Sequence, residues 1–61
     1  MTRKDYQLVA DTLASFSKGI DTNDSKGWSE YATLVEMLSV QFSKDNPRFN
    51  SDVFFTACEV N

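Results

Sequence analysis

Four of the six basic side chains of this 61-residue chain lie in two short groups near its ends. Arg3 and Lys4 form the first group, and Lys44 and Arg48 form the second. Guanidinium and ammonium groups bind phosphates and carboxylates through charge-assisted hydrogen bonds. The four residues are therefore candidates for binding a phosphate, a nucleotide, a nucleic-acid backbone or an acidic protein surface.

A structural role is the alternative for the second group. Lys44 would complement the negative end of a helix dipole, and Arg48 would pair with Asp45 or Asp52. Both interpretations follow from the same spacing, so both stay open at the level of sequence.

The chain lacks the side chains that most catalysis uses. It has no histidine, which removes the usual near-neutral general base, the common nucleophile pairs and the commonest metal ligand. Cys58 is the single cysteine. Since no neighbouring base would lower its pKa, we expect a small buried apolar residue there rather than a nucleophile. We therefore expect no enzymatic activity.

No metal or cofactor site is expected either. Asp21, Asn23 and Ser25 alternate as the ligands of a calcium loop do. The match fails because Lys26 stands where the turn glycine is needed and Ala32 stands where the bidentate glutamate is needed. A helix-capping loop explains the same composition, and the sequence has no glycine-rich phosphate loop.

Helical spacing predicts three helices at about residues 3–18, 25–45 and 51–59. The residues expected to face the core from the first two helices are Tyr6, Val9, Leu13, Phe16, Ile20, Trp28, Tyr31, Leu34, Val35, Leu38 and Phe42. No alternating pattern between turn residues predicts a strand. The expected fold class is all-α, a small three-helix domain over residues 1–61 with two antiparallel amphipathic helices and a short C-terminal helix.

The helix ends carry recognisable signals. Thr2 and Asp5 have the spacing of a capping box at the start of the first helix. Gly19 is expected to end that helix in the left-handed conformation. Pro47 ends the second helix, and Asn50 is expected to cap the third.

Three apolar residues fall outside the core-facing stripes: Leu8 in the first helix, and Met37 and Val40 in the second. Either the third helix covers them, or they form a binding face for a second copy of the chain or for another protein. The first account is favoured because a short helix with Phe54 and Phe55 must bury its rings.

A short loop at residues 21–27 makes the first two helices antiparallel neighbours. The start of the first helix and the end of the second then share one pole, and all four candidate basic residues gather there. The opposite pole carries Asp21, Asp24 and Glu30. The expected charge asymmetry makes the basic pole a candidate binding site.

The composition limits the partners. With 41% hydrophobic and 13% aromatic residues the chain is expected to fold. A net charge of −3 and a third helix without a base disfavour DNA reading by a helix-turn-helix domain. No apolar run is long enough for a membrane span or a signal peptide, so a cytoplasmic location is expected.

Two blocks of the sequence resemble a family of very small phage and prophage proteins of unassigned function. The matching residues are Met1 to Tyr6 with Val9 and Ala10, and Asp45 to Asn50 with Phe54, Ala57 and Cys58. The blocks cover about half the chain, and Asp52-Val53 stands where a base is expected before Phe54. The resemblance implies a viral origin, a host-cytoplasm setting and no known activity.

The sequence thus predicts a non-enzymatic protein that binds a host or viral protein, through the Leu8, Met37 and Val40 face or through the basic pole. A homodimer is one form in which it would do so. The alternative is a module that binds a phosphate, a nucleotide or nucleic acid at the basic pole, without a membrane partner.

Overall fold

The computed structural model describes residues 1–60, and these contain three helices and no strand. Helix α1 spans Arg3–Ser17, α2 spans Ser25–Asp45 and α3 spans Ser51–Ala57. The all-α, three-helix fold class is confirmed, and α2 has its predicted bounds. None of these helices is long and apolar enough to cross a membrane.

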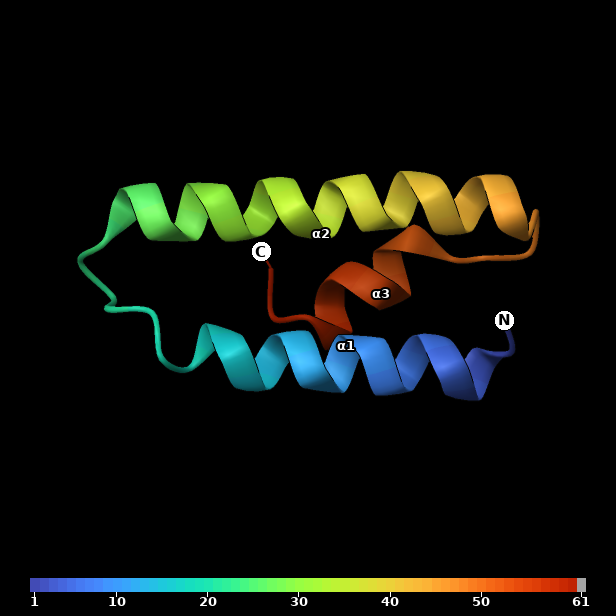
Figure 1. Ribbon diagram of the computed structural model, residues 1–61, viewed down its shortest axis with the longest axis horizontal. Coiled ribbons are helices and arrows are strands. Elements are labelled where there is room, and N and C mark those ends of the chain that lie inside the picture. The colour runs from blue at the N-terminus through green and yellow to red at the C-terminus, as the bar shows by residue number, and fades with distance from the viewer. Residues whose placement is uncertain (61) are drawn as a thin grey trace.

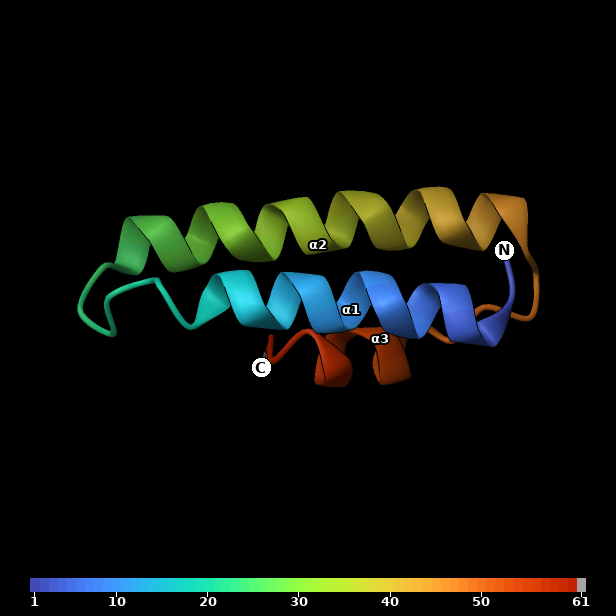
Figure 2. The same cartoon turned by 60° about the horizontal axis from the view of Figure 1, so that its bottom comes forward.

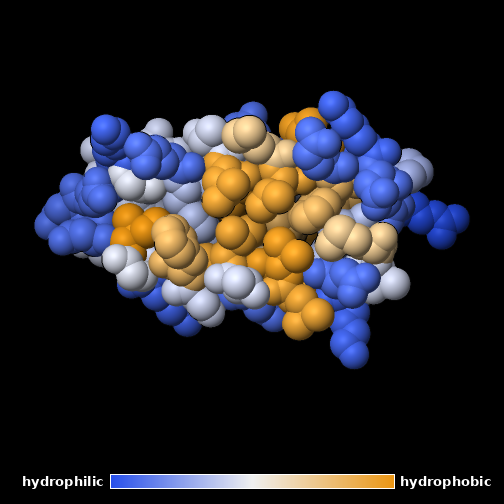
Figure 3. All heavy atoms as spheres, viewed as in Figure 1, coloured by the Kyte–Doolittle hydropathy of each residue, from blue (hydrophilic) through white to orange (hydrophobic). Residues whose placement is uncertain are grey.

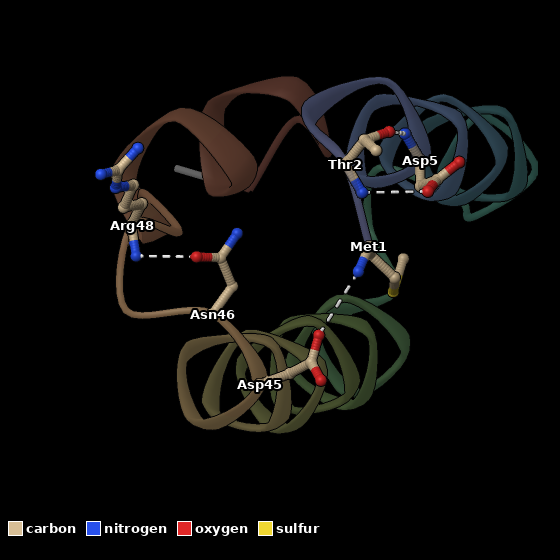
Figure 4. A network of polar contacts seen from close by, with 6 residues as sticks. All are labelled: Met1, Thr2, Asp5, Asp45, Asn46 and Arg48. Atoms are coloured by element: carbon tan, nitrogen blue, oxygen red, sulfur yellow. Dashed lines mark hydrogen bonds and ion pairs between the residues drawn. The ribbon is translucent and has the colours of Figure 1, made fainter.

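Each helix begins at a side-chain cap. The Thr2 hydroxyl accepts a hydrogen bond from the Asp5 backbone N–H at 3.3 Å, and the Asp5 carboxylate accepts one from the Thr2 N–H at 3.0 Å (Figure 4). This is the predicted capping box, and its hydrogen bonds lower the pKa of Asp5. Asp24 caps α2 by accepting from the Gly27 N–H at 2.9 Å. Asn50 caps α3, as predicted.

The C-terminal ends of α1 and α3 differ from the prediction. Among residues 1–60 no glycine has a positive φ, so the left-handed conformation expected at Gly19 is wrong. Helix α1 ends in a tight turn in which the Gly19 N–H donates to the Phe16 carbonyl at 3.1 Å. The left-handed residue is instead Glu59, with φ 62°, just beyond α3. It ends α3 two residues before the predicted position, because the Val60 N–H then folds back onto the Phe55 carbonyl.

The helices pack as a triangle of unequal sides. Figure 1 shows α1 and α2 as antiparallel rods, with α1 beginning at the end where α2 stops. Figure 2 shows α3 beside α1, on one side of the hairpin, and Figure 4 shows the three helices around a common centre. The backbone of α3 approaches both long helices more closely than these approach each other. The third helix therefore completes the core.

The core joins all three helices. Its buried residues are Ala10, Tyr31, Val35, Phe54 and Cys58. The Tyr31 hydroxyl donates a hydrogen bond to the Cys58 carbonyl at 2.8 Å, which ties α2 to the end of α3. An aromatic cluster extends the core towards the pole where α1 begins. It consists of Tyr6, Phe42, Phe49 and Phe54, with neighbouring ring centroids 4.8 to 5.5 Å apart.

Two of the predicted core residues remain on the surface. Phe16 is 65% exposed and Leu34 is 45% exposed. Helix α3 has seven residues, which is about 10 Å of helix, and it does not reach the end of the hairpin where α1 leads into α2 (Figure 1). Phe16, at that end, has only two helices to pack between. Leu34 is exposed for a different reason, because it lies about 100° around α2 from the buried Val35 and points away from the core.

The expectation that the third helix covers Leu8, Met37 and Val40 is wrong. These side chains are 58%, 62% and 46% exposed. Helix α3 packs against the inward sides of α1 and α2, where Ala10 and Val35 are buried. Leu8 and Met37 lie on the opposite sides of their helices, about 160° around from those buried residues.

Candidate functional site

A groove of about 500 Å³ lies at the pole where α1 begins. Helix α1 forms one wall, and the segment 46–50 with α3 forms the other. We call it the α1–α3 groove. Its lining residues are Arg3, Tyr6, Gln7, Ala10, Asn46, Arg48, Phe49, Asn50, Val53, Phe54 and Ala57. Figure 3 shows hydrophobic surface over the middle of the molecule, with hydrophilic residues at both ends.

Small residues open the groove between the two helices. Ala10 of α1 and Ala57 of α3 both line it, and neither side chain extends beyond a methyl group. The aromatic residues Tyr6, Phe49 and Phe54 also line it. The groove therefore offers an apolar wall to a side chain or ring of a ligand.

Two cations stand at this groove from distant parts of the sequence. Arg3 belongs to the first turn of α1 and Arg48 to the segment before α3, and both line the groove with exposed side chains. The structure thus brings to one groove two of the four basic residues that the sequence predicted at this pole. An anionic group in the groove would meet charge from both walls.

Neither arginine is neutralised by an acid within residues 1–60. The ion pair of Asp45 is with the Met1 amino group at 3.5 Å. Arg48 uses its backbone N–H to donate to the Asn46 side-chain carbonyl at 3.0 Å. Its guanidinium points away from Asp45 (Figure 4). The predicted alternative, in which Arg48 pairs with Asp45 or Asp52, is not what the structure shows.

One residue of the groove wall carries a buried polar atom. The Tyr6 hydroxyl is buried and has no hydrogen-bond partner among residues 1–60. A buried hydroxyl without a partner costs about 1 to 3 kcal/mol. It is a hydrogen-bond donor and acceptor that the fold leaves unused on a residue of the groove wall.

The other predicted site residues lie elsewhere. Lys4 and Lys44 are exposed but do not line the groove. Of the four basic residues predicted at this pole, only the two arginines therefore belong to the site. Leu8 faces outward from α1, whereas Met37 and Val40 face outward from α2. Because the inward sides of the two helices face a common core, these outward sides point away from one another. Leu8 therefore shares no face with Met37 and Val40.

Sequence reasoning missed the polar groups that line the groove beside the arginines. Gln7 lies one turn after Arg3 on α1, and its amide donates to the Asp11 carboxylate at 2.8 Å. Asn46 and Asn50 contribute from the second wall. The one available signal was the four-residue step from Arg3 to Gln7, which places both on one helix face beside Ala10.

The described residues offer no nucleophile to the groove. Cys58 is 0% exposed, and burial raises the pKa of its thiol to about 11. A thiol with that pKa is protonated at neutral pH and unreactive. No group of three or more cysteine, aspartate or glutamate side chains among residues 1–60 is arranged to hold a metal ion. The arrangement is suited to binding a group with an anionic and an apolar part.

Comparison with known proteins gives no match to this chain, neither to a family model nor to a curated protein or solved structure. The resemblance to very small phage proteins therefore stays a prediction.

Proposed function

We propose that this chain is a non-catalytic binding protein that holds an acidic segment of a host or viral partner protein in the α1–α3 groove. The convergence of Arg3 and Arg48 on one apolar groove is the observation that carries the proposal. A carboxylate of the partner would lie between the guanidinium groups, and a neighbouring apolar side chain would pack on the aromatic wall.

The charge distribution favours a protein segment over a nucleic acid. Long phosphate backbones are bound by extended positive surfaces, but this chain has a net charge of −3. Lys4 and Lys44, which would have to extend the positive surface, do not line the groove. An acidic protein segment presents only a few carboxylates at one place, and the two arginines are enough to attract these.

A photo-crosslinking experiment tests the proposal inside cells that express the protein. A photoreactive amino acid replaces Val53, which lines the groove and is 60% exposed. The matched control places it at Leu8, which is 58% exposed and does not line the groove. We expect one acidic protein to be captured from position 53 and not from position 8.

Charge reversal then identifies the contact. Arg3→Glu with Arg48→Glu should abolish capture, whereas Lys4→Glu with Lys18→Glu changes the net charge equally and should not. Equal capture by both double variants would contradict the proposal. So would capture that is unaffected by salt, because an arginine–carboxylate contact weakens as salt is added.

A small phosphate-bearing ligand is the second candidate, and one observation favours it. The groove volume of about 500 Å³ falls in the range of small-molecule sites, about 300 to 1,000 Å³. Titration of the pure protein with ATP, followed by amide NMR shifts, tests it directly. Saturable shifts at Ala57 and Gln7 that vanish in the Arg3→Glu, Arg48→Glu variant would support this candidate over a protein segment. ATP that moves no groove resonance would remove it.

A further inference from the structure

The outward side of α2 carries five residues with a symmetric spacing, which we call the α2 stripe: Glu30, Leu34, Met37, Val40 and Lys44. Successive steps along it are four, three, three and four residues. All five side chains are exposed, and the central residue, Met37, lies about 160° around the helix from the buried Val35. Met37 at its centre is 62% exposed, and neither α1 nor α3 covers it.

The spacing of the five residues is symmetric about Met37, but the charges at the two ends of the stripe have opposite signs. Glu30 lies seven residues before Met37, and Lys44 lies seven residues after it. At about 1.5 Å per residue, each charge is about 10 Å along the helix from the centre. A copy of α2 running the opposite way about a twofold axis at Met37 places its lysine level with this glutamate.

We propose that the α2 stripe binds the α2 stripe of a second copy of this chain in antiparallel orientation. Met37 would pack on Met37 of the second copy, and Leu34 of each copy would lie level with Val40 of the other. Two Glu30–Lys44 contacts would close the ends of the apolar strip. A twofold interface of this kind needs one surface that is complementary to itself, and the α2 stripe has that property.

Charge complementarity selects both the occupant and the direction. Neither Glu30 nor Lys44 forms an ion pair within residues 1–60. A parallel pairing would set like charges level with each other, which is unfavourable. The outward side of α1 has no comparable pattern, because Leu8 is its isolated large apolar residue between Lys4 and Asp11. The second copy therefore docks on α2 rather than on α1.

Pairing through α2 leaves the α1–α3 groove open, since none of the stripe residues lines it. The dimer would present two grooves. The proposal is independent of what the groove binds, because the two surfaces share no residue.

Sedimentation velocity over a concentration series measures the association of the whole chain. We expect the weight-average mass to rise with concentration from that of one chain towards that of two. Met37→Asp should keep the chain monomeric at every concentration, and the matched control Leu8→Asp should associate as the unchanged protein does. Helical circular dichroism of each variant establishes that it is folded.

Charge reversal tests the antiparallel register. Glu30→Lys sets lysine level with lysine in the pair, and Lys44→Glu sets glutamate level with glutamate, so each variant alone should be monomeric or at least tenfold weaker in association. An equimolar mixture of the two variants should form a heterodimer. One chain then carries lysine at both positions and the other carries glutamate at both, so each end of the stripe has a lysine level with a glutamate. The double variant Glu30→Lys, Lys44→Glu should associate as the unchanged protein does.

Three results would overturn the proposal. The first is an unchanged protein that stays monomeric at all concentrations. The second is a dimer that Met37→Asp does not weaken, because it would use another surface. The third is a pair of folded charge variants that fail to associate when mixed, because the antiparallel register requires that they do.

Discussion

The two ends of the molecule differ in how they bury their aromatic side chains. At the end where α1 begins, which we call the α3 end, Tyr6, Phe42, Phe49 and Phe54 pack ring against ring. At the other end, the hairpin end, Phe16 faces Tyr31 across 6.2 Å but remains 65% exposed. Where only the two long helices meet, an aromatic ring stays exposed to water, and where the third helix joins them the rings are buried or half-buried.

Local polar contacts stabilise the hairpin end instead. The Trp28 indole N–H donates to the Asp21 carbonyl at 3.1 Å, and the Asn23 backbone N–H donates to the Asp21 carboxylate at 2.9 Å. Contacts of this kind contribute about 1 kcal/mol each, less than a buried ring. Stability should therefore concentrate at the α3 end, and the following predictions test that contrast from the largest expected effect to the smallest.

Removing a ring should matter far more at the α3 end. Phe54→Ala empties a site that is 3% exposed and should cost about 3 to 5 kcal/mol in the free energy of unfolding. Such a loss approaches the whole stability of a small chain, so the variant should lose its cooperative transition. Phe16→Ala at the hairpin end should cost less than about 1 kcal/mol. Urea denaturation followed by circular dichroism measures both, and equal losses would break the contrast.

Two tyrosines should respond in opposite ways to loss of the hydroxyl. Tyr31→Phe leaves the Cys58 carbonyl without its buried donor and should cost about 1 to 3 kcal/mol. Tyr6→Phe removes a hydroxyl that has no partner within residues 1–60, so its effect should be neutral or stabilising. The same denaturation assay compares them. A loss in Tyr6→Phe as large as that in Tyr31→Phe would show that the Tyr6 hydroxyl is bonded.

The end of α3 should accept a stabilising substitution. Glu59 has φ 62°, a conformation that glycine adopts without a steric cost. Glu59→Gly should therefore raise the free energy of unfolding by about 0.5 to 1 kcal/mol. Glu59→Ala is the matched control, because it removes the charge but keeps the Cβ. A gain in the alanine variant as large as that in the glycine variant would assign the effect to charge rather than to backbone conformation.

The last prediction concerns an effect that is zero at neutral pH, where it is the smallest of the series, and that develops only in alkali. Burial raises the pKa of Cys58 from 9.0 to about 11, and burial also raises the pKa of Tyr31. The unfolded chain then releases the thiol proton at a lower pH than the folded chain does, so stability should fall as the pH rises from about 9 to about 11. Unfolding measured across that range should show a shallower decline in Cys58→Ala. An identical decline in both proteins would contradict a buried thiol.

The prediction from sequence was accurate for helix ends that local chemistry determines. The capping hydrogen bonds of Thr2, Asp5 and Asn50 reach only two or three residues along the chain, so these caps are visible in the sequence. Glu59 was missed because glycine is the usual residue in the left-handed position. The turn at Glu59 is accompanied by the hydrogen bond from the Val60 N–H to the Phe55 carbonyl and by packing of Val60 against the core.

The candidate site was predicted in part for the same reason. Arg3 and Arg48 were brought to one pole by the antiparallel arrangement of two helices, which loop length alone predicts. That the same pole contains a groove depends on α1 and α3 each presenting a small side chain to it, Ala10 and Ala57. Sequence spacing does not show that these two alanines line one groove, because they are far apart in the chain.

The sequence by itself determined the three helices, the N-terminal caps of α1 and α3 and the absence of histidine chemistry, since each depends on residue types and short spacings. The tertiary structure alone decided which side of the hairpin α3 covers, and with it the exposure of Phe16, the groove beside Arg3 and the bare outward stripe of α2. The physical reason is that a short helix can bury its rings against several surfaces of a two-helix hairpin. The choice among those surfaces depends on side chains that meet only when all three helices are in place.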